Sequence, residues 1–121
     1  MIGYATIGSN DLEKAKAFYD KVLVPLGGKR SFASDRMQGW SGAGGAMLAV
    51  CAPYDGQKAV SGNGNMLALS APSPEVIGEV HALALANGGQ DEGAPGERMP
   101  GFYGAYFRDL DGNKLCVFKM G

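Results

Sequence analysis

The chain has few of the residues from which metal and nucleophilic sites are usually built. Its 121 residues include one histidine, two cysteines and one tryptophan. Cys51 and Cys116 form no CxxC pair, and a tetrahedral zinc site made only of cysteine and histidine needs four ligands. We therefore exclude that kind of zinc site and expect free thiols in a reducing compartment. A catalytic pair of one cysteine with His81 stays open, although no neighbouring residue activates either thiol.

Long apolar runs and an excess of charge of one sign are also missing. Eleven basic and twelve acidic residues are interspersed and give a formal net charge of −1, so no basic surface for nucleic acid or anionic lipid is expected. No apolar run approaches the roughly 20 residues of a membrane-spanning helix. The first seven residues contain neither the basic segment nor the long apolar segment of a signal peptide. We expect a cytoplasmic protein of one domain (residues 1–121), with no nucleic-acid and no membrane partner.

Glycine is abundant, at 20 of 121 residues, and separates the patterned segments. Residues 3–8 are predicted to form a strand. Asn10 and Glu13 match a capping box at the start of a helix, whose apolar stripe recurs at spacings of three and four residues. The stripe consists of Leu12, Ala15, Phe18, Tyr19 and Val22. After Gly27 and Gly28, three strands are expected at 29–32, 36–41 and 46–52.

The second half repeats this order. A strand is expected at 66–71, followed by a helix that begins with Ser73 as N-cap and Pro74 at its first position. The glycine and proline content of residues 90–101 predicts a loop, and its part from Gly93 to Gly101 is a candidate mobile cover. Strands at 102–108 and 114–119 flank a turn at 109–113. We predict an α+β fold of two βαβββ modules, at about residues 1–58 and 59–121.

Two segments carry a resemblance to a known family. They are S-N-D-L-E-K-A-K-A-F-Y-D at residues 9–20 and F-R-D-L-D-G-N-K-L at residues 107–115. The chain resembles the vicinal oxygen chelate superfamily of glyoxalase, bleomycin resistance and dioxygenase proteins, with Leu110 where proline is usual. The resemblance implies a cupped, incompletely closed mixed β-barrel and a homodimer. Without it, the first segment is simply an amphipathic helix and the second a tight hairpin.

In that family, metal-dependent members place histidine or glutamate ligands on four strands that line the cup. The matching positions in this sequence are Tyr4, Ala49, Met66 and Cys116. These residues do not suit a divalent metal that prefers oxygen or imidazole ligands. The neighbouring alternatives Thr6, Asn63 and Asn65 are weak ligands. We therefore predict no metal and no cofactor.

The remaining cup-lining candidates are aromatic, sulfur-containing or basic. A tryptophan and tyrosines beside arginine would suit a planar or anionic small molecule. In the simpler interpretation the methionines fill the core, the arginines are solvated, and Gly62–Asn63–Gly64 is a turn rather than an anion site. The candidate ligand-binding residues are Tyr4, Trp40, Met47, Met66, Tyr103, Cys116, Arg36 and Arg98, with Arg108 as a further basic side chain.

Three functions remain open. The first is a metal-free protein that binds a small organic molecule in its cup. The alternative is a glyoxalase-type lyase or isomerase, for instance a glutathione-linked one, in which Cys116, Tyr4 or Glu97 transfers a proton. The third is sequestration of a drug, as in the bleomycin resistance members, and the near-neutral charge gives no particular support to an acidic cup.

Overall fold

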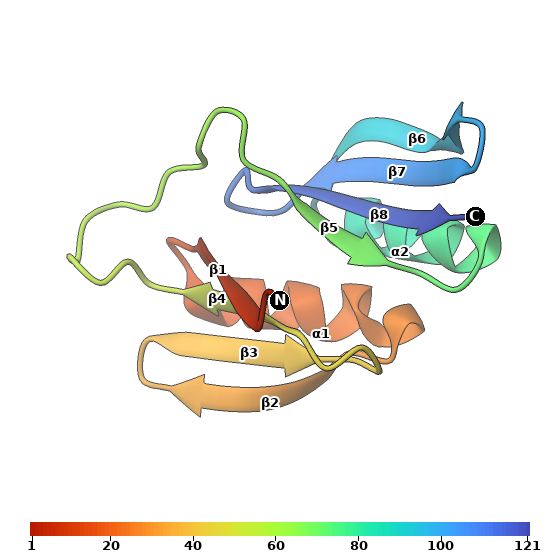
Figure 1. Ribbon diagram of the computed structural model, residues 1–121. Helices are drawn as coiled ribbons and strands as arrows, with labels where there is room; N and C mark the ends of the chain where they lie inside the picture. The colour runs from red at the N-terminus through yellow and green to blue at the C-terminus, as the bar shows by residue number, and fades with distance from the viewer.

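The computed structural model describes all 121 residues and contains two four-stranded sheets with a helix behind each (Figure 1). The first sheet has the order β1-β4-β3-β2 and the second the order β5-β8-β7-β6. The first module consists of β1 (Tyr4–Gly8), α1 (Leu12–Val22), a short 3-10 helix (Val24–Leu26), β2 (Lys29–Ser34), β3 (Met37–Ser41) and β4 (Met47–Cys51). The second consists of β5 (Leu67–Ser70), α2 (Pro74–Ala86), β6 (Gln90–Met99), β7 (Phe102–Arg108) and β8 (Lys114–Met120).

The two modules have the same topology. The strand before each helix pairs in parallel with the last strand of its module, β1 with β4 and β5 with β8. The remaining neighbours are antiparallel, because their connections are too short for a helical crossover. The predicted α+β fold of two βαβββ units is confirmed, and the sheets do not close into a barrel.

The predicted N-cap of α2 is confirmed, whereas the predicted N-cap of α1 is wrong. Ser73 caps α2 by accepting a hydrogen bond from the amide of Val76 at 3.3 Å. The cap of α1 is Asp11, not Asn10. Asn10 instead pairs with the backbone of Ala59, accepting from its N–H at 2.8 Å and donating to its carbonyl at 3.0 Å. The predicted capping box is wrong because this side chain holds the connection between the modules.

Residues 90–99 form strand β6 rather than the predicted loop. This strand pairs with β7, and its register shifts at three places between Asp91 and Met99. Its glycines and proline are tolerated because β6 is an edge strand with irregular pairing. The segment proposed as a mobile cover is therefore largely part of a sheet.

One hydrophobic core joins the two modules. Its sixteen buried residues come from both helices and both sheets, and they include Tyr19 of α1, Ile77 of α2 and Phe107 of β7. The rings of Phe18 and Phe107 lie 6.4 Å apart across the two modules. Because neither helix has a core of its own, we expect the modules to unfold together.

The two motif segments meet at the buried carboxylate of Asp109. It accepts hydrogen bonds from the Tyr19 hydroxyl at 2.6 Å, from the amides of Asp111 and Asn113 at 2.9 Å, and from Asn113 Nδ2 at 3.0 Å. Burial, followed by the charge of Asp109, raises the pKa of Tyr19 well above its usual value. The hydroxyl therefore keeps the proton that it donates.

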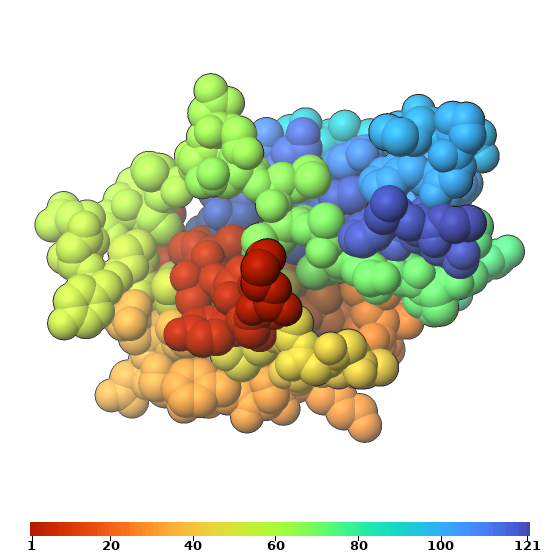
Figure 2. Space-filling view, viewed as in Figure 1, coloured from red at the N-terminus to blue at the C-terminus, as the bar shows by residue number.

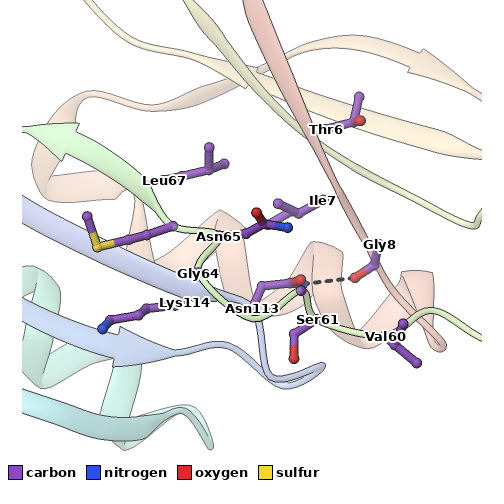
Figure 3. A pocket seen from close by; sticks show the side chains of 12 residues that line it. Thr6, Ile7, Gly8, Val60, Ser61, Gly64, Asn65, Leu67, Asn113 and Lys114 are labelled. Carbon is purple, nitrogen blue, oxygen red and sulfur yellow. Dashed lines mark hydrogen bonds between the residues drawn. The ribbon is translucent and has the colours of Figure 1, made fainter.

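The same turn also reaches the first strand. Asn113 Nδ2 donates to the carbonyl of Gly8 at 2.9 Å (Figure 3), and Asp111 Oδ1 accepts from the amide of Asn10 at 2.8 Å. The turn between β7 and β8 thus ties α1 and the end of β1 to the second module. Both motifs are explained by the fold alone, since their polar side chains bind each other.

Candidate functional site

The helices cover one side of both sheets and leave the other side open. We call this second side the open face; Figure 2 shows it, with the N-terminal residues between the two sheets. Leu48 and Leu115 point into the core. Because side chains alternate along a strand, their neighbours Ala49 and Cys116 point to the open face. In the strand pairing, Tyr4 lies opposite Met47 and Tyr106 lies opposite Cys116. These two tyrosines therefore also point to the open face.

Three of the positions that match the family's metal ligands, Tyr4, Ala49 and Cys116, lie on this face. Met66 directly precedes β5, two residues before Ala68, which pairs with Cys116. Tyr4 and Met66 are 62% and 44% exposed, whereas Ala49 and Cys116 are buried. The set offers a phenol, a thioether and a thiol. No group of three or more histidine, cysteine, aspartate or glutamate side chains lies close enough to hold a metal, so these residues do not fit a divalent metal.

A pocket of about 430 Å³ lies at the seam between the modules (Figure 3). One wall comes from the end of β1, another from the start of β5 and β8, and a third from the connection that precedes β5. Four of its twelve lining residues are hydrophobic. The lining residues are Thr6, Ile7, Gly8, Val60, Ser61, Gly62, Gly64, Asn65, Met66, Leu67, Asn113 and Lys114.

The connection that forms the pocket wall is held in place by the start of the first module. Ala59 is buried, and its backbone is paired with the Asn10 side chain. A Cβ added at Gly8 would come within 2.9 Å of the Ala59 Cβ, so glycine is needed for this close approach. Gly64 has a φ of +90° and lies in the turn expected for Gly62–Asn63–Gly64. Met66 alone of the eight predicted ligand-binding residues lines this pocket.

Trp40 and Tyr103 point toward the helices, so they do not line the open face. Trp40 is 2% exposed, its ring lies 5.5 Å from that of Tyr19, and its indole N–H donates to Asp20 at 3.0 Å. Hydrogen bonds from Arg30, and then from Trp40, lower the pKa of Asp20 against the opposing effect of burial. Tyr103 packs against the core. The sequence pattern did not reveal this because both residues have apolar rings that suit either face.

The other predicted residues are dispersed. Met47 lies on the open face and covers Gly39, where an added Cβ would clash with its sulfur. Arg36 donates to the carbonyl of Ala52 at 2.8 Å and lies 5.3 Å from the ring of Tyr54, so its guanidinium has partners in the first module. Arg98 lies on β6 over the ring of Tyr106. Arg108 is paired with Glu92 at 2.6 Å.

Cys116 is buried on the open face beside Tyr106. Burial raises the pKa of its thiol, while a hydrogen bond with Tyr106 and the charges of Arg98 and Lys114 act in the opposite direction. The net effect keeps the thiol protonated at neutral pH. Cys116 is therefore poorly suited to act as the proton-transferring base of the enzyme hypothesis.

The two thiols are expected to react at different rates with a disulfide reagent. In the folded protein Cys51 is partly exposed and Cys116 is 1% exposed, so we predict one fast and one slow thiol per chain. Absorbance-monitored reaction with dithiobis(nitrobenzoate) measures both phases. Cys51→Ala should remove the fast phase. A fast Cys116 in that variant would contradict the buried, protonated thiol described above.

The fold defines a protein of two βαβββ modules whose helices leave one side of both sheets uncovered. The chain belongs to the Glyoxalase/Bleomycin resistance protein/Dioxygenase superfamily, whose sequence profile matches residues 1–117. The resemblance stated from the two motif segments is thereby confirmed. No helix in the structure has the length and apolar character needed to cross a membrane.

Solved structures agree with this assignment. A glyoxalase/bleomycin resistance protein from Albidiferax ferrireducens T118 is 39% identical, with a TM-score of 0.91 over 98% of this chain and 97% of that one. A family enzyme from Burkholderia phytofirmans PsJN (20% identity, TM-score 0.79, 98% of both chains) shares the fold. So does a putative glyoxalase from Bacillus halodurans (21% identity, TM-score 0.78, 98% of this chain and 94% of that one). A comparison with curated proteins gave no match.

Proposed function

We propose that this protein binds a small organic molecule on its open face without a metal ion at the four ligand positions of the family. The observation that carries the proposal is the donor set. Tyr4, Ala49, Met66 and Cys116 provide no carboxylate and no imidazole, although their strands are arranged as in related structures. Binding would then depend on shape, apolar contact and hydrogen bonds.

The pocket at the seam supports this proposal. Its polar side chains, among them Thr6, Asn65 and Lys114, can orient a ligand, and Met66 and Leu67 offer apolar contact. The carboxamide of Asn113 is already engaged by Gly8 and Asp109, so it serves the fold rather than the ligand. The ligand we envisage therefore has both polar and apolar parts.

We further propose that the protein is a cytoplasmic homodimer without nucleic-acid partners. Large apolar side chains are exposed at the open face, including Tyr4, Met66 and Met120. A second copy of the chain would cover them and enclose the ligand. Light scattering coupled to gel filtration would give a mass near 25 kDa, about twice the 12.6 kDa of one chain; a mass of one chain at high micromolar concentration would contradict the dimer.

The function is tested by thermal stabilisation and turnover on the same protein. A library of small organic molecules should contain compounds that raise the melting temperature, since a ligand at 100 times its Kd adds about 2.7 kcal/mol. Methylglyoxal–glutathione hemithioacetal with added Ni²⁺ or Zn²⁺ should not be turned over. Metal-dependent turnover would favour the lyase alternative and overturn the metal-free proposal.

A further inference from the structure

We infer that Arg98 and Lys114, held against the ring of Tyr106, form an anion-binding site on the open face of the second sheet, which recognises a carboxylate or phosphate group of the ligand. This inference rests on the proposed function, in which the open face is the ligand side. It adds a chemical class to the ligand: an organic anion.

The three side chains come from three adjacent strands. Tyr106 of β7 lies between Lys114 of β8 and Arg98 of β6. The Arg98 guanidinium carbon lies 5.3 Å from the centre of the Tyr106 ring, and the Lys114 ammonium lies 5.6 Å from it. Two cations are thus held against one aromatic ring.

Neither cation has a carboxylate partner. The ion pairs of the chain do not include Arg98 or Lys114. Glu92 on β6 is bonded to Arg108 at 2.6 Å. This hydrogen bond lowers the pKa of Glu92, and the charges of Arg108 and Lys114 act in the same direction. Both cations lie against one ring and neither has a carboxylate counterion, so an anion that binds beside that ring gains charge-assisted contacts.

The backbone of β6 is shaped to hold Arg98 in this position. A Cβ at Gly93 would lie 3.0 Å from the Tyr106 ring and 3.1 Å from the Arg98 guanidinium, and a Cβ at Gly96 would lie 3.0 Å from that guanidinium. Arg98 also donates to the carbonyl of Ala94. The guanidinium therefore folds back over its own strand toward Tyr106. This explains two of the glycines that led the sequence pattern to predict a loop.

The cluster adjoins the pocket at the seam. Lys114 lines the pocket and also contacts Tyr106, so one side chain belongs to both. An anionic group bound by Arg98 and Lys114 would leave the rest of the ligand beside Met66 and Leu67. The geometry therefore favours a small organic anion with an apolar body over a free inorganic ion.

The test is an NMR titration of the ¹⁵N-labelled full chain with benzoate, benzamide and inorganic phosphate. We expect benzoate and phosphate to shift the amides of residues 93, 94, 96–98 and 114, and neutral benzamide to leave them unchanged. The double variant Arg98→Gln with Lys114→Gln should weaken benzoate binding at least tenfold. The matched control Lys29→Gln, which removes an exposed lysine of the first sheet, should bind as the wild type does.

Two results would overturn the inference: equal benzoate affinity in the double variant, or equal shifts with benzamide. The failure of the proposed function is distinguishable from these results. If no organic molecule stabilises the protein but phosphate still shifts these amides and loses its effect in the double variant, the anion site stands and the broader function fails. If organic ligands stabilise wild type and double variant equally, the function stands and the anion site fails.

Discussion

Replacing Asp109 by alanine is expected to lower the free energy of unfolding by about 3–5 kcal/mol. The carboxylate is buried and accepts four hydrogen bonds, from Tyr19, Asp111 and Asn113. Hydrogen bonds to a charged group contribute about 1.5–3 kcal/mol each, and a buried donor left unpaired adds a penalty. Urea unfolding followed by circular dichroism measures the loss.

Two further variants make this test specific. Tyr19→Phe removes only one of the four donors, so we expect a smaller loss of about 1.5–3 kcal/mol. Asp35→Ala removes an exposed carboxylate without a partner among the side-chain hydrogen bonds and ion pairs, and it should change stability by no more than about 0.5 kcal/mol. Similar effects for Asp109→Ala and Asp35→Ala would show that the turn does not tie the modules together.

Replacing Phe107 by alanine is expected to cost about 3–5 kcal/mol and to destabilise both modules at once. Phe107 is fully buried in the second module and faces Phe18 of the first, and truncation of such a ring leaves a cavity. Trp40 is the only tryptophan and lies in the first module. Its fluorescence therefore reports whether a change in one module reaches the other.

For Phe107→Ala we predict that the urea midpoint of Trp40 fluorescence falls together with that of circular dichroism. The control Phe32→Ala removes a ring that is half exposed on β2 and should shift neither midpoint by much. If the Trp40 midpoint stayed at the wild-type value in Phe107→Ala, the two modules would have separate cores, contrary to the single cluster observed.

Much of the fold could be predicted from local patterns. The helices were found from apolar residues at spacings of three and four, and Ser73 marked a true cap. The repeat of strand, helix and three strands led to two modules. The exceptions have physical causes. Asn10 has a typical capping side chain, but a tertiary partner, the backbone of Ala59, competes for it. Strand β6 was hidden because its glycines and proline are accommodated by irregular edge pairing.

The site was much less predictable. Alternation within a strand identifies two faces, but the sequence does not say which face meets the helices. Trp40 was therefore placed on the wrong side of β3, where its neighbours Gly39 and Ser41 face outward. The pocket combines Thr6, Asn65 and Lys114 from three segments that only the tertiary structure brings together. The pattern offered Arg98 as a candidate, but it did not predict that Arg98 and Lys114 lie against the ring of Tyr106.

Four positions of this chain match those at which the family's metal-dependent members hold their ligands. Whether they bind a metal is tested most directly by the metal content of the purified, untagged protein, measured by elemental analysis before and after incubation with Zn²⁺, Ni²⁺, Fe²⁺ and Mn²⁺ followed by dialysis. Because Tyr4, Ala49, Met66 and Cys116 offer no carboxylate or imidazole, we predict well below one equivalent of any metal per chain. One retained equivalent per chain that disappears in Cys116→Ala would contradict this account.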